Sequence, residues 1–129
     1  MVNRYETTKV VQPIKRALEK IGCVVHKTHG GLYSSGLPDL LIWKPNGSCV
    51  CIETKYITTR NISGLGLINH LSTTQLGFFT WLRKRTQAKI LIIGGNENGG
   101  YVITRFPPLN EDVLRTRTLE ETIDYIIEY

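Results

Sequence analysis

The sequence is poor in cysteine, with three such residues among 129, and it contains no CxxC pair. That is too few thiols for a disulfide framework or a four-cysteine zinc site. The chain has no run of about 18 apolar residues, which excludes a membrane-spanning helix. Its first 20 residues alternate charged and apolar side chains and lack the apolar segment of a signal peptide. We therefore expect a protein of the reducing cytoplasm that does not contact a membrane.

No internal repeat, low-complexity tract or long linker divides the chain, and its length corresponds to about one domain. We expect residues 1–129 to form that single domain. Hydrophobic residues make up 41% of the chain and charged residues 21%, a balance typical of globular proteins. The net charge is +5, with 16 basic and 11 acidic side chains, which favours an anionic partner such as nucleic acid.

Hydrophobic periodicity and turn residues together predict a series of helices and strands. The expected helices span residues 4–21, 71–86 and 118–128, and the expected strands span residues 23–28, 37–43, 49–55, 89–93 and 101–104. Residues 56–71 show no regular pattern, so we expect an irregular segment there. Pro13 requires that the first helix either kinks or is regular only in its second half. The order α-β-β-β-α-β-β-α predicts an α/β fold with a central mixed sheet flanked by helices.

The hairpin between residues 37 and 55 carries the most specific signal. Its turn, Lys-Pro-Asn-Gly at 44–47, has the residues of a type I turn followed by a left-handed glycine. The register that this loop imposes places Asp39 directly opposite Glu53. A two-residue turn at the Asn-Gly pair shifts the register by one residue and places Asp39 opposite Thr54 instead. We favour the first register because the proline fits it.

In the favoured register, three functional side chains share one face of the hairpin. Directly opposed residues have Cβ atoms about 5 Å apart, and Lys55 lies on the same face as Glu53. Two carboxylates that close repel each other unless a cation lies between them, and Mg²⁺ typically takes one or two carboxylates with water and substrate phosphate. A lysine beside the metal can orient a water or stabilise phosphate charge. The cluster therefore suits phosphodiester hydrolysis.

These residues resemble a known family. Segments 36–42 (Gly-Leu-Pro-Asp-Leu-Leu-Ile) and 52–55 (Ile-Glu-Thr-Lys) are similar to the PD-(D/E)xK nuclease superfamily. The preceding helix, the glycine before the Pro-Asp pair and the helix start Leu-Ser-Thr-Thr-Gln at 71–75 resemble its VRR-NUC branch, the virus-type replication-repair nuclease domains. Archaeal Holliday-junction resolvases share that core. The resemblance covers about residues 4–93 and implies a restriction-endonuclease-like α/β fold.

The resemblance also implies roles for the hairpin residues. Asp39 and Glu53 would be metal ligands, together with the main-chain carbonyl of Thr54, and Lys55 would be the catalytic lysine. Family members cut DNA with Mg²⁺, which Mn²⁺ can replace, and leave 5′-phosphate and 3′-hydroxyl ends. Small stand-alone members act as homodimers on branched DNA. We therefore expect DNA, branched or double-stranded, as partner and a homodimer as the assembly.

Two residues outside the hairpin complete the implied site. Glu6 matches the glutamate of the first helix that commonly adds a metal ligand, with Glu19 as its rival near the end of the same helix. Gln75 matches a glutamine close to the active site in this branch, and we count it with the catalytic candidates. Gln75 also completes a capping box with Ser72, and the two roles are compatible.

Basic side chains near these segments are candidates for binding the DNA backbone. Lys27, His29 and Arg60 flank the proposed site in sequence. Arg83 and Lys84 lie at the end of the second long helix, where the helix dipole alone also favours cations. The site itself contains more carboxylates than lysines and is therefore acidic. We expect the basic residues that give the chain its positive net charge to lie around the site.

The sequence therefore predicts a metal-dependent DNA endonuclease that selects branched DNA such as Holliday junctions. Three alternatives stay open. The first is a DNA-binding module that keeps the fold without cutting, and the second is an interaction subunit whose hairpin cluster is only a surface salt bridge. The third is a nuclease that acts on plain duplex DNA.

Overall fold

A six-stranded mixed sheet forms the centre of the computed structural model, which describes residues 6–28, 36–96, 98, 100–108 and 113–129. The strands lie in the order of the sequence: β1 (Val24–Lys27), β2 (Leu40–Trp43), β3 (Cys49–Tyr56), β4 (Lys89–Gly95), β5 (Tyr101–Arg105) and β6 (Leu114–Thr116). Neighbours are antiparallel except β3 and β4, which run parallel. The predicted mixed sheet is confirmed.

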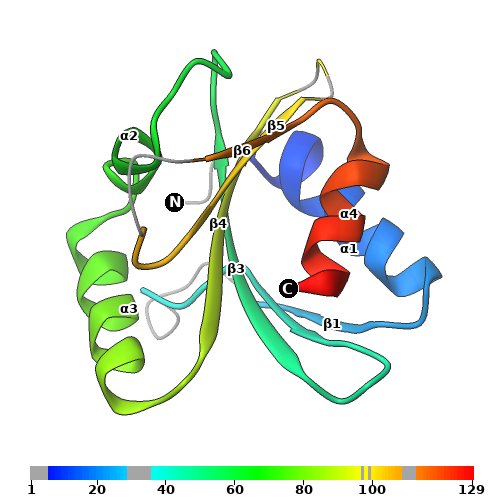
Figure 1. Cartoon of the computed structure of the whole chain (residues 1–129), viewed down its shortest axis with the longest axis horizontal. Coiled ribbons are helices and arrows are strands. Elements are labelled where there is room, and N and C mark those ends of the chain that lie inside the picture. The colour runs from blue at the N-terminus through cyan, green and yellow to red at the C-terminus, as the bar shows by residue number, and fades with distance from the viewer. Residues whose placement is uncertain (1–5, 29–35, 97, 99, 109–112) are drawn as a thin grey trace.

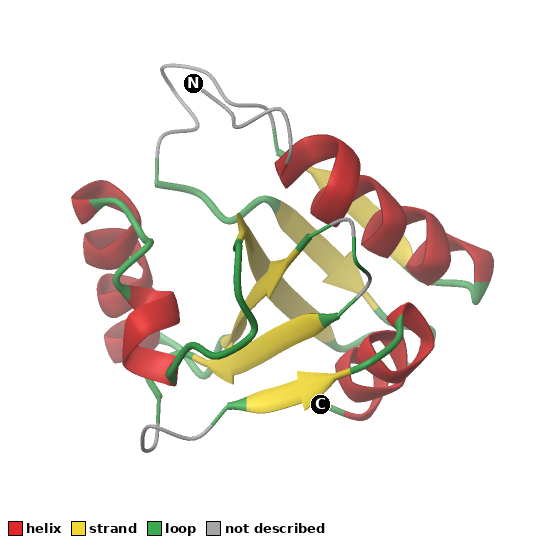
Figure 2. Ribbon diagram, turned by 90° about the horizontal axis from the view of Figure 1, so that it is seen from above, coloured by secondary structure: helices red, strands yellow, loops and turns green. Residues whose placement is uncertain are grey.

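Helices cover both faces of this sheet. They are the π-helix η1 (Glu6–Val11) and the α-helices α1 (Gln12–Lys20), α2 (Gly64–Ile68), α3 (Thr73–Arg85) and α4 (Leu119–Glu128). Helices α1 and α4 lie on one side of the sheet, and α2 and α3 lie on the other (Figures 1 and 2). The predicted arrangement of helices around a sheet is confirmed. Among the described residues, no helix has the length and apolar character needed to cross a membrane.

The first helical segment is regular only in its second half, which is one of the two outcomes that Pro13 allowed. The π-helix ends at Val11 and the α-helix begins at Gln12, so that Pro13 stands in the first turn of α1. A proline is tolerated there because the first amide groups of a helix have no intrahelical partner. Gly22, with φ of +98°, follows the last turn.

Two short elements were not predicted. The expectation that residues 56–71 are irregular is wrong for 64–68, where α2 forms after Ser63, whose hydroxyl accepts a hydrogen bond from the Gly66 amide at 3.0 Å. The last strand, β6, was also missed. Elements this short contain too few residues to repeat a hydrophobic period, so the sequence carries no recognisable pattern for them, and tertiary packing stabilises them.

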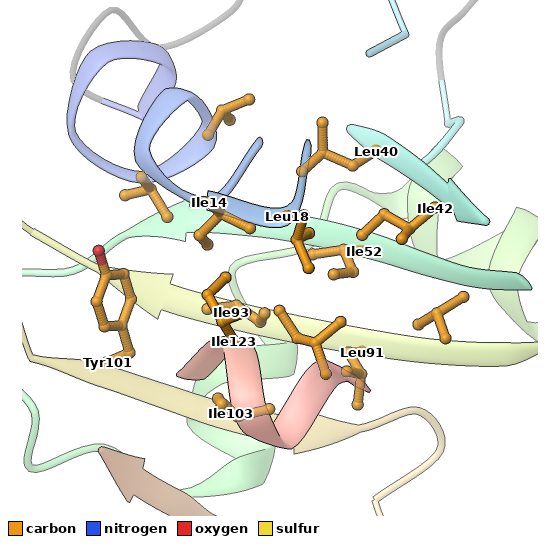
Figure 3. Close-up of a cluster of buried hydrophobic side chains, with 14 of the residues drawn as sticks. Ile14, Leu18, Leu40, Ile42, Ile52, Leu91, Ile93, Tyr101, Ile103 and Ile123 are labelled. Atoms are coloured by element: carbon orange, nitrogen blue, oxygen red, sulfur yellow. The ribbon is translucent and has the colours of Figure 1, made fainter. Parts of the chain in front are cut away.

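The core consists of two apolar clusters, one on each face of the sheet. One lies under α1 and α4 and includes Ile14, Leu18, Ile52 and Ile123 (Figure 3). The other lies under α2 and α3 and includes Leu67, Phe79, Ile90 and Ile92.

Strand β3 contributes to both clusters because successive side chains of a strand point to opposite faces. Val50 and Ile52 belong to the cluster under α1 and α4, whereas Cys51 packs against the other cluster. Glu53 and Lys55 therefore point toward the face that carries α2 and α3. This alternation decides which helix can complete the site.

Candidate active site

The hairpin adopts the favoured register. Leu40 lies opposite Ile52, as the three-residue loop requires. The Lys44 amide donates to the Ser48 carbonyl at 2.9 Å, and the Gly47 amide donates to the Lys44 carbonyl at 2.8 Å. Gly47 has φ of +89°, the left-handed conformation expected of the bulge. The alternative two-residue turn is excluded.

Asp39 immediately precedes β2 and contacts two consecutive residues of β3. Its amide donates to Glu53 Oε1 at 3.1 Å. Its carboxylate oxygen Oδ2 accepts from the Thr54 amide at 2.9 Å and from the Thr54 hydroxyl at 2.6 Å. The sequence indicated a role only for the Thr54 carbonyl and missed this hydroxyl. The second carboxylate oxygen of Asp39 accepts no hydrogen bond from the described part of the chain.

The Thr54 carbonyl faces the same edge of β3 as Asp39. In a strand, the N–H and C=O of one residue point to the same neighbouring strand, and the Thr54 N–H points to Asp39. The ladder with β2 ends at the pair Leu40 and Ile52, so no β2 amide continues it opposite Thr54. The carbonyl is thus placed to act as an oxygen ligand beside the Asp39 carboxylate.

Gly36 allows the segment before Asp39 to approach α3. It has φ of +88°, and a Cβ atom there would lie 2.9 Å from the Thr74 side chain and 3.2 Å from the Thr74 carbonyl oxygen. A side chain at this position is therefore both strained and blocked by backbone. The close approach brings the beginning of α3 against the hairpin, where Gln75 is located.

Glu53, Lys55 and Gln75 form a closed set of contacts. Lys55 Nζ lies 3.2 Å from Glu53 Oε2 and 3.1 Å from Gln75 Oε1. Gln75 Nε2 donates to Glu53 Oε2 at 2.7 Å. Glu53 is only 1% exposed, although it carries an ionisable group. The three side chains therefore hold one another in place on the face covered by α3.

The pKa of Glu53 is raised to about 8. Burial is the largest cause and the nearby Asp39 carboxylate adds to it, whereas Lys55 and Gln75 lower the pKa. Without a bound cation, the site thus retains a proton near neutral pH. A divalent cation beside the two carboxylates would displace that proton and compensate both charges.

Gln75 serves the helix and the site at once. Its Oε1 atom accepts from the Ser72 amide at 3.0 Å, and the Ser72 hydroxyl accepts from the Gln75 amide at 3.1 Å, which completes a capping box. The same Oε1 atom accepts from Lys55. The N-terminus of α3 is therefore fixed by the residue that also contacts Glu53 and Lys55.

The donor atoms at this edge fit Mg²⁺. The carboxylates of Asp39 and Glu53 and the Thr54 carbonyl supply hard oxygen ligands, and Mg²⁺ commonly completes its shell with water and substrate phosphate. Among the described side chains, no group of three or more His, Cys, Asp or Glu residues gathers into a metal site. A magnesium ion here would therefore depend on water, phosphate or a further residue for its other ligands.

The structure distinguishes between the two glutamates of the first helical segment. Glu6 is the first residue of η1, and its side chain lies outside the described part of the chain. Glu19 is exposed and forms an ion pair with Lys15 at 3.0 Å on α1, on the face of the sheet opposite Glu53. Glu19 therefore does not complete the site, and the role of Glu6 stays a prediction.

The candidate DNA-binding residues are spread over the molecule. Lys27 ends β1 opposite Leu40, one residue from Asp39. Arg60 follows β3 and packs against Gly100. His29 lies outside the described residues.

Arg83 and Lys84 lie apart from the site, in the last turn of α3. They are about 12 to 14 Å from Gln75 along the helix axis. Arg83 Nη1 donates to the Ala88 carbonyl at 2.8 Å, a contact that joins the end of α3 to the segment before β4. The structure therefore does not bring these two residues to the carboxylates.

In the metal-free protein, we expect Glu53→Gln to raise the free energy of unfolding at pH 8.5 by about 4 to 5 kcal/mol. The pKa of Glu53 in the folded state, about 8, lies above its usual value of 4.5. Between these values the folded state binds more protons than the unfolded state, so the stability of the parent falls as pH rises through this window. Glutamine does not titrate and escapes that loss.

Urea unfolding in EDTA at pH 5 and pH 8.5 measures this effect. The matched control is Glu128→Gln, an exposed position on α4 where we expect a change within about 0.5 kcal/mol. A Glu53→Gln protein that gains no stability at pH 8.5, or gains the same amount at both pH values, would contradict a raised pKa.

Comparisons with known proteins identify solved structures that have a similar fold. The chain is similar to a solved structure described as a VRR_NUC domain, with 23% identity and a TM-score of 0.52 over 93% of this chain and 91% of the other. It is also similar to the Archaeoglobus fulgidus Hjc protein, a Holliday junction resolvase from an archaeal hyperthermophile, with 13% identity and a TM-score of 0.52 over 80% of each chain. No protein-family model and no curated protein matches the sequence. The chain therefore has the restriction-endonuclease-like fold shared by these two proteins, as the sequence predicted.

Proposed function

We propose that this protein is a Mg²⁺-dependent DNA endonuclease of the VRR-NUC type. The observation that carries the proposal is the convergence of Asp39, Glu53 and Lys55 at one edge of β3, within the fold of a nuclease domain. The contacts that hold these residues together come from three separate segments of the chain. A chance pair of surface charges would not account for the burial of Glu53, which is 1% exposed.

In this proposal, Asp39, Glu53 and the Thr54 carbonyl hold the metal ion, and Glu6 is a further candidate ligand. When bound, Mg²⁺ supplies Lewis acidity that lowers the pKa of a coordinated water and stabilises charge on phosphate. Lys55 orients the attacking water and stabilises the charge that develops on the phosphoryl oxygens. Gln75 is a positioning residue that fixes the side chains of Glu53 and Lys55.

The charges of the chain suit a substrate with a phosphate backbone. The site itself is acidic, while the whole chain carries a net charge of +5, so cations elsewhere must attract the DNA. Lys27 and Arg60 lie in the segments next to the site and are our candidates for direct backbone contacts. Arg83 and Lys84 are candidates for contacting a more distant part of the same DNA. Binding of this kind weakens as salt concentration rises.

Branched DNA is the substrate that we favour, and a homodimer is the assembly. A two-fold dimer would place two sites on symmetric strands of a four-way junction. The sheet also offers an apolar surface for such a contact, since Val24 and its cross-strand partner Trp43 are 65% and 40% exposed. Both residues lie at the β1 end of the sheet.

A cleavage panel tests the substrate class. End-labelled four-way junction, flap, nicked duplex and plain duplex of matched sequence are incubated with the protein and Mg²⁺, with Mn²⁺ as the second metal. We expect the junction to be cut at least tenfold faster than the plain duplex, leaving 5′-phosphate ends. Equal rates on all four would indicate a nuclease without structure selectivity. Binding to the DNA without cutting in either metal would favour the non-cleaving module.

A further inference from the structure

The segment 57–63 directly follows the strand that carries Lys55, and its beginning is fixed to the end of β4. The Ile57 amide donates to the Gly95 carbonyl at 3.0 Å, and Asn96 Nδ2 donates to the Ile57 carbonyl at 3.0 Å. Asn96 is 7% exposed. The beginning of this segment, next to the site, is therefore fixed by hydrogen bonds.

Arg115 of β6 fixes the middle of the same segment. Its Nε atom donates to the Arg60 carbonyl at 2.8 Å, and its Nη2 atom donates to the Ile62 carbonyl at 3.0 Å. One guanidinium thus bonds two carbonyls of a turn that lies more than fifty residues earlier in the chain. The planar fork of arginine suits such a double contact, which a lysine ammonium does not reproduce in the same geometry.

The side chain of Arg60 lies directly against the backbone of Gly100. A Cβ atom at Gly100 would be 2.5 Å from Arg60 Cδ and 2.7 Å from Arg60 Nε. The Nε atom is buried and has no hydrogen-bond partner among the described residues. An arginine held in this way loses less conformational freedom when it binds a ligand than one extended into solvent.

The position of Gly100 places Arg60 near the site. Lys55 lies opposite Gly94 on β4, and Gly95 lies opposite Tyr101, the residue after Gly100. The contact between Arg60 and Gly100 is thus about 7 Å along the sheet and about 10 Å across it from the backbone of Lys55. Since the phosphates of one DNA strand recur about every 3.4 Å along the helix axis, this separation corresponds to a few nucleotides.

We propose that Arg60 binds a backbone phosphate a few nucleotides from the scissile bond, and that Arg115 and Gly100 position it. The strands β5 and β6, which the sequence left without a role, then belong to the substrate-binding apparatus. The inference rests on the proposed function for its ligand, DNA, but it concerns binding and is measured without cleavage.

The test is a double-mutant cycle on DNA affinity, measured in EDTA with a fluorescent four-way junction. We expect Arg60→Gln to weaken binding about tenfold and to reduce the slope of log K against log salt by about 1. Arg115→Gln should weaken binding three- to tenfold in the parent and less than 1.5-fold in the Arg60→Gln background. Additive losses would mean that Arg115 contacts DNA by itself, which overturns the positioning role.

Two further variants separate positioning from loss of charge. Gly100→Ala keeps every charge but displaces the Arg60 side chain, and we expect it to weaken binding in the parent and not in the Arg60→Gln background. Arg117→Gln removes one positive charge just beyond β6, and it should change affinity less than twofold in either background. Thermal unfolding confirms that each variant is folded.

The possible results distinguish this inference from the proposed nuclease activity. Junction binding with the expected coupling, but no cleavage in Mg²⁺, would support the inference and overturn the activity. Normal cleavage with Arg60→Gln affinity equal to that of the parent would overturn the inference alone. Failure of the parent to bind any DNA would overturn both.

Discussion

Replacing Lys55 by methionine is expected to reduce the single-turnover rate of DNA cleavage by a factor of about 10² to 10⁴. The Lys55 ammonium is the positive side chain in direct contact with the buried Glu53, at 3.2 Å, and its side chain is only 13% exposed. Methionine retains the length and apolar stem of lysine but cannot orient a water or stabilise phosphate charge. The rate is measured with end-labelled junction at saturating Mg²⁺ and pH 8.5, so that protonation of Glu53 does not limit metal binding.

The matched control for this change is Lys20→Met. Lys20 is exposed at the end of α1, on the face of the sheet opposite the site, and the substitution removes the same charge. It should cleave within twofold of the parent. We expect Lys55→Met to bind the junction within threefold of the parent, because its role is in the reaction. A Lys55→Met protein that cleaves at the parental rate would show that the site is assigned wrongly.

Asp39→Asn is expected to abolish both metal binding and cleavage, with a loss of rate of at least about 10³. Asparagine retains an oxygen that can accept from the Thr54 amide, as Asp39 Oδ2 does at 2.9 Å. The backbone contact with Glu53 does not depend on the side chain. The substitution therefore removes a negative charge from the site while preserving its local structure.

The metal effect is measured as the rise in melting temperature on adding Mg²⁺. The parent should gain stability, whereas Asp39→Asn should gain none. Asp124→Asn, at an exposed position on α4, is the control and should respond to Mg²⁺ like the parent. An equal response in all three proteins would place the metal elsewhere or show that it binds without specificity.

The hairpin shows how much of the site a sequence can specify. Its turn residues determined the register, and the register determined that Asp39 and Glu53 meet. The alternation of side chains then placed Lys55 beside Glu53. Each of these steps depends on residues less than twenty positions apart, so local geometry was sufficient.

The contacts made by α3 and β6 needed the tertiary structure. The capping box at Ser72 is visible in the sequence, but the distance of 2.7 Å between Gln75 and Glu53 depends on how α3 packs across β3. The contacts of Arg115 with the Arg60 and Ile62 carbonyls join segments that have no common local pattern. The raised pKa of Glu53 follows from the same packing, because burial is its largest cause.

The positions of the basic residues relative to the site could be predicted only in part from the sequence. Nearness in sequence correctly placed Lys27 beside the start of β2 and Arg60 just beyond β3. It did not reveal that Arg83 bonds the Ala88 carbonyl, at the end of α3 remote from the carboxylates. A cluster of basic residues at the C-terminal end of a helix can be explained by the helix dipole or by a bound ligand. The distance between that helix end and the site is known only from the tertiary structure.

The most direct test of the account is cleavage of a labelled four-way junction by the parent protein as a function of Mg²⁺ concentration. We predict no cleavage in EDTA, saturable cleavage as Mg²⁺ is added, and full recovery when excess Mg²⁺ follows the chelator. Undiminished cleavage in EDTA would contradict a metal-dependent site at Asp39 and Glu53. Absence of cleavage at every Mg²⁺ and Mn²⁺ concentration, with the junction bound, would contradict nuclease activity itself.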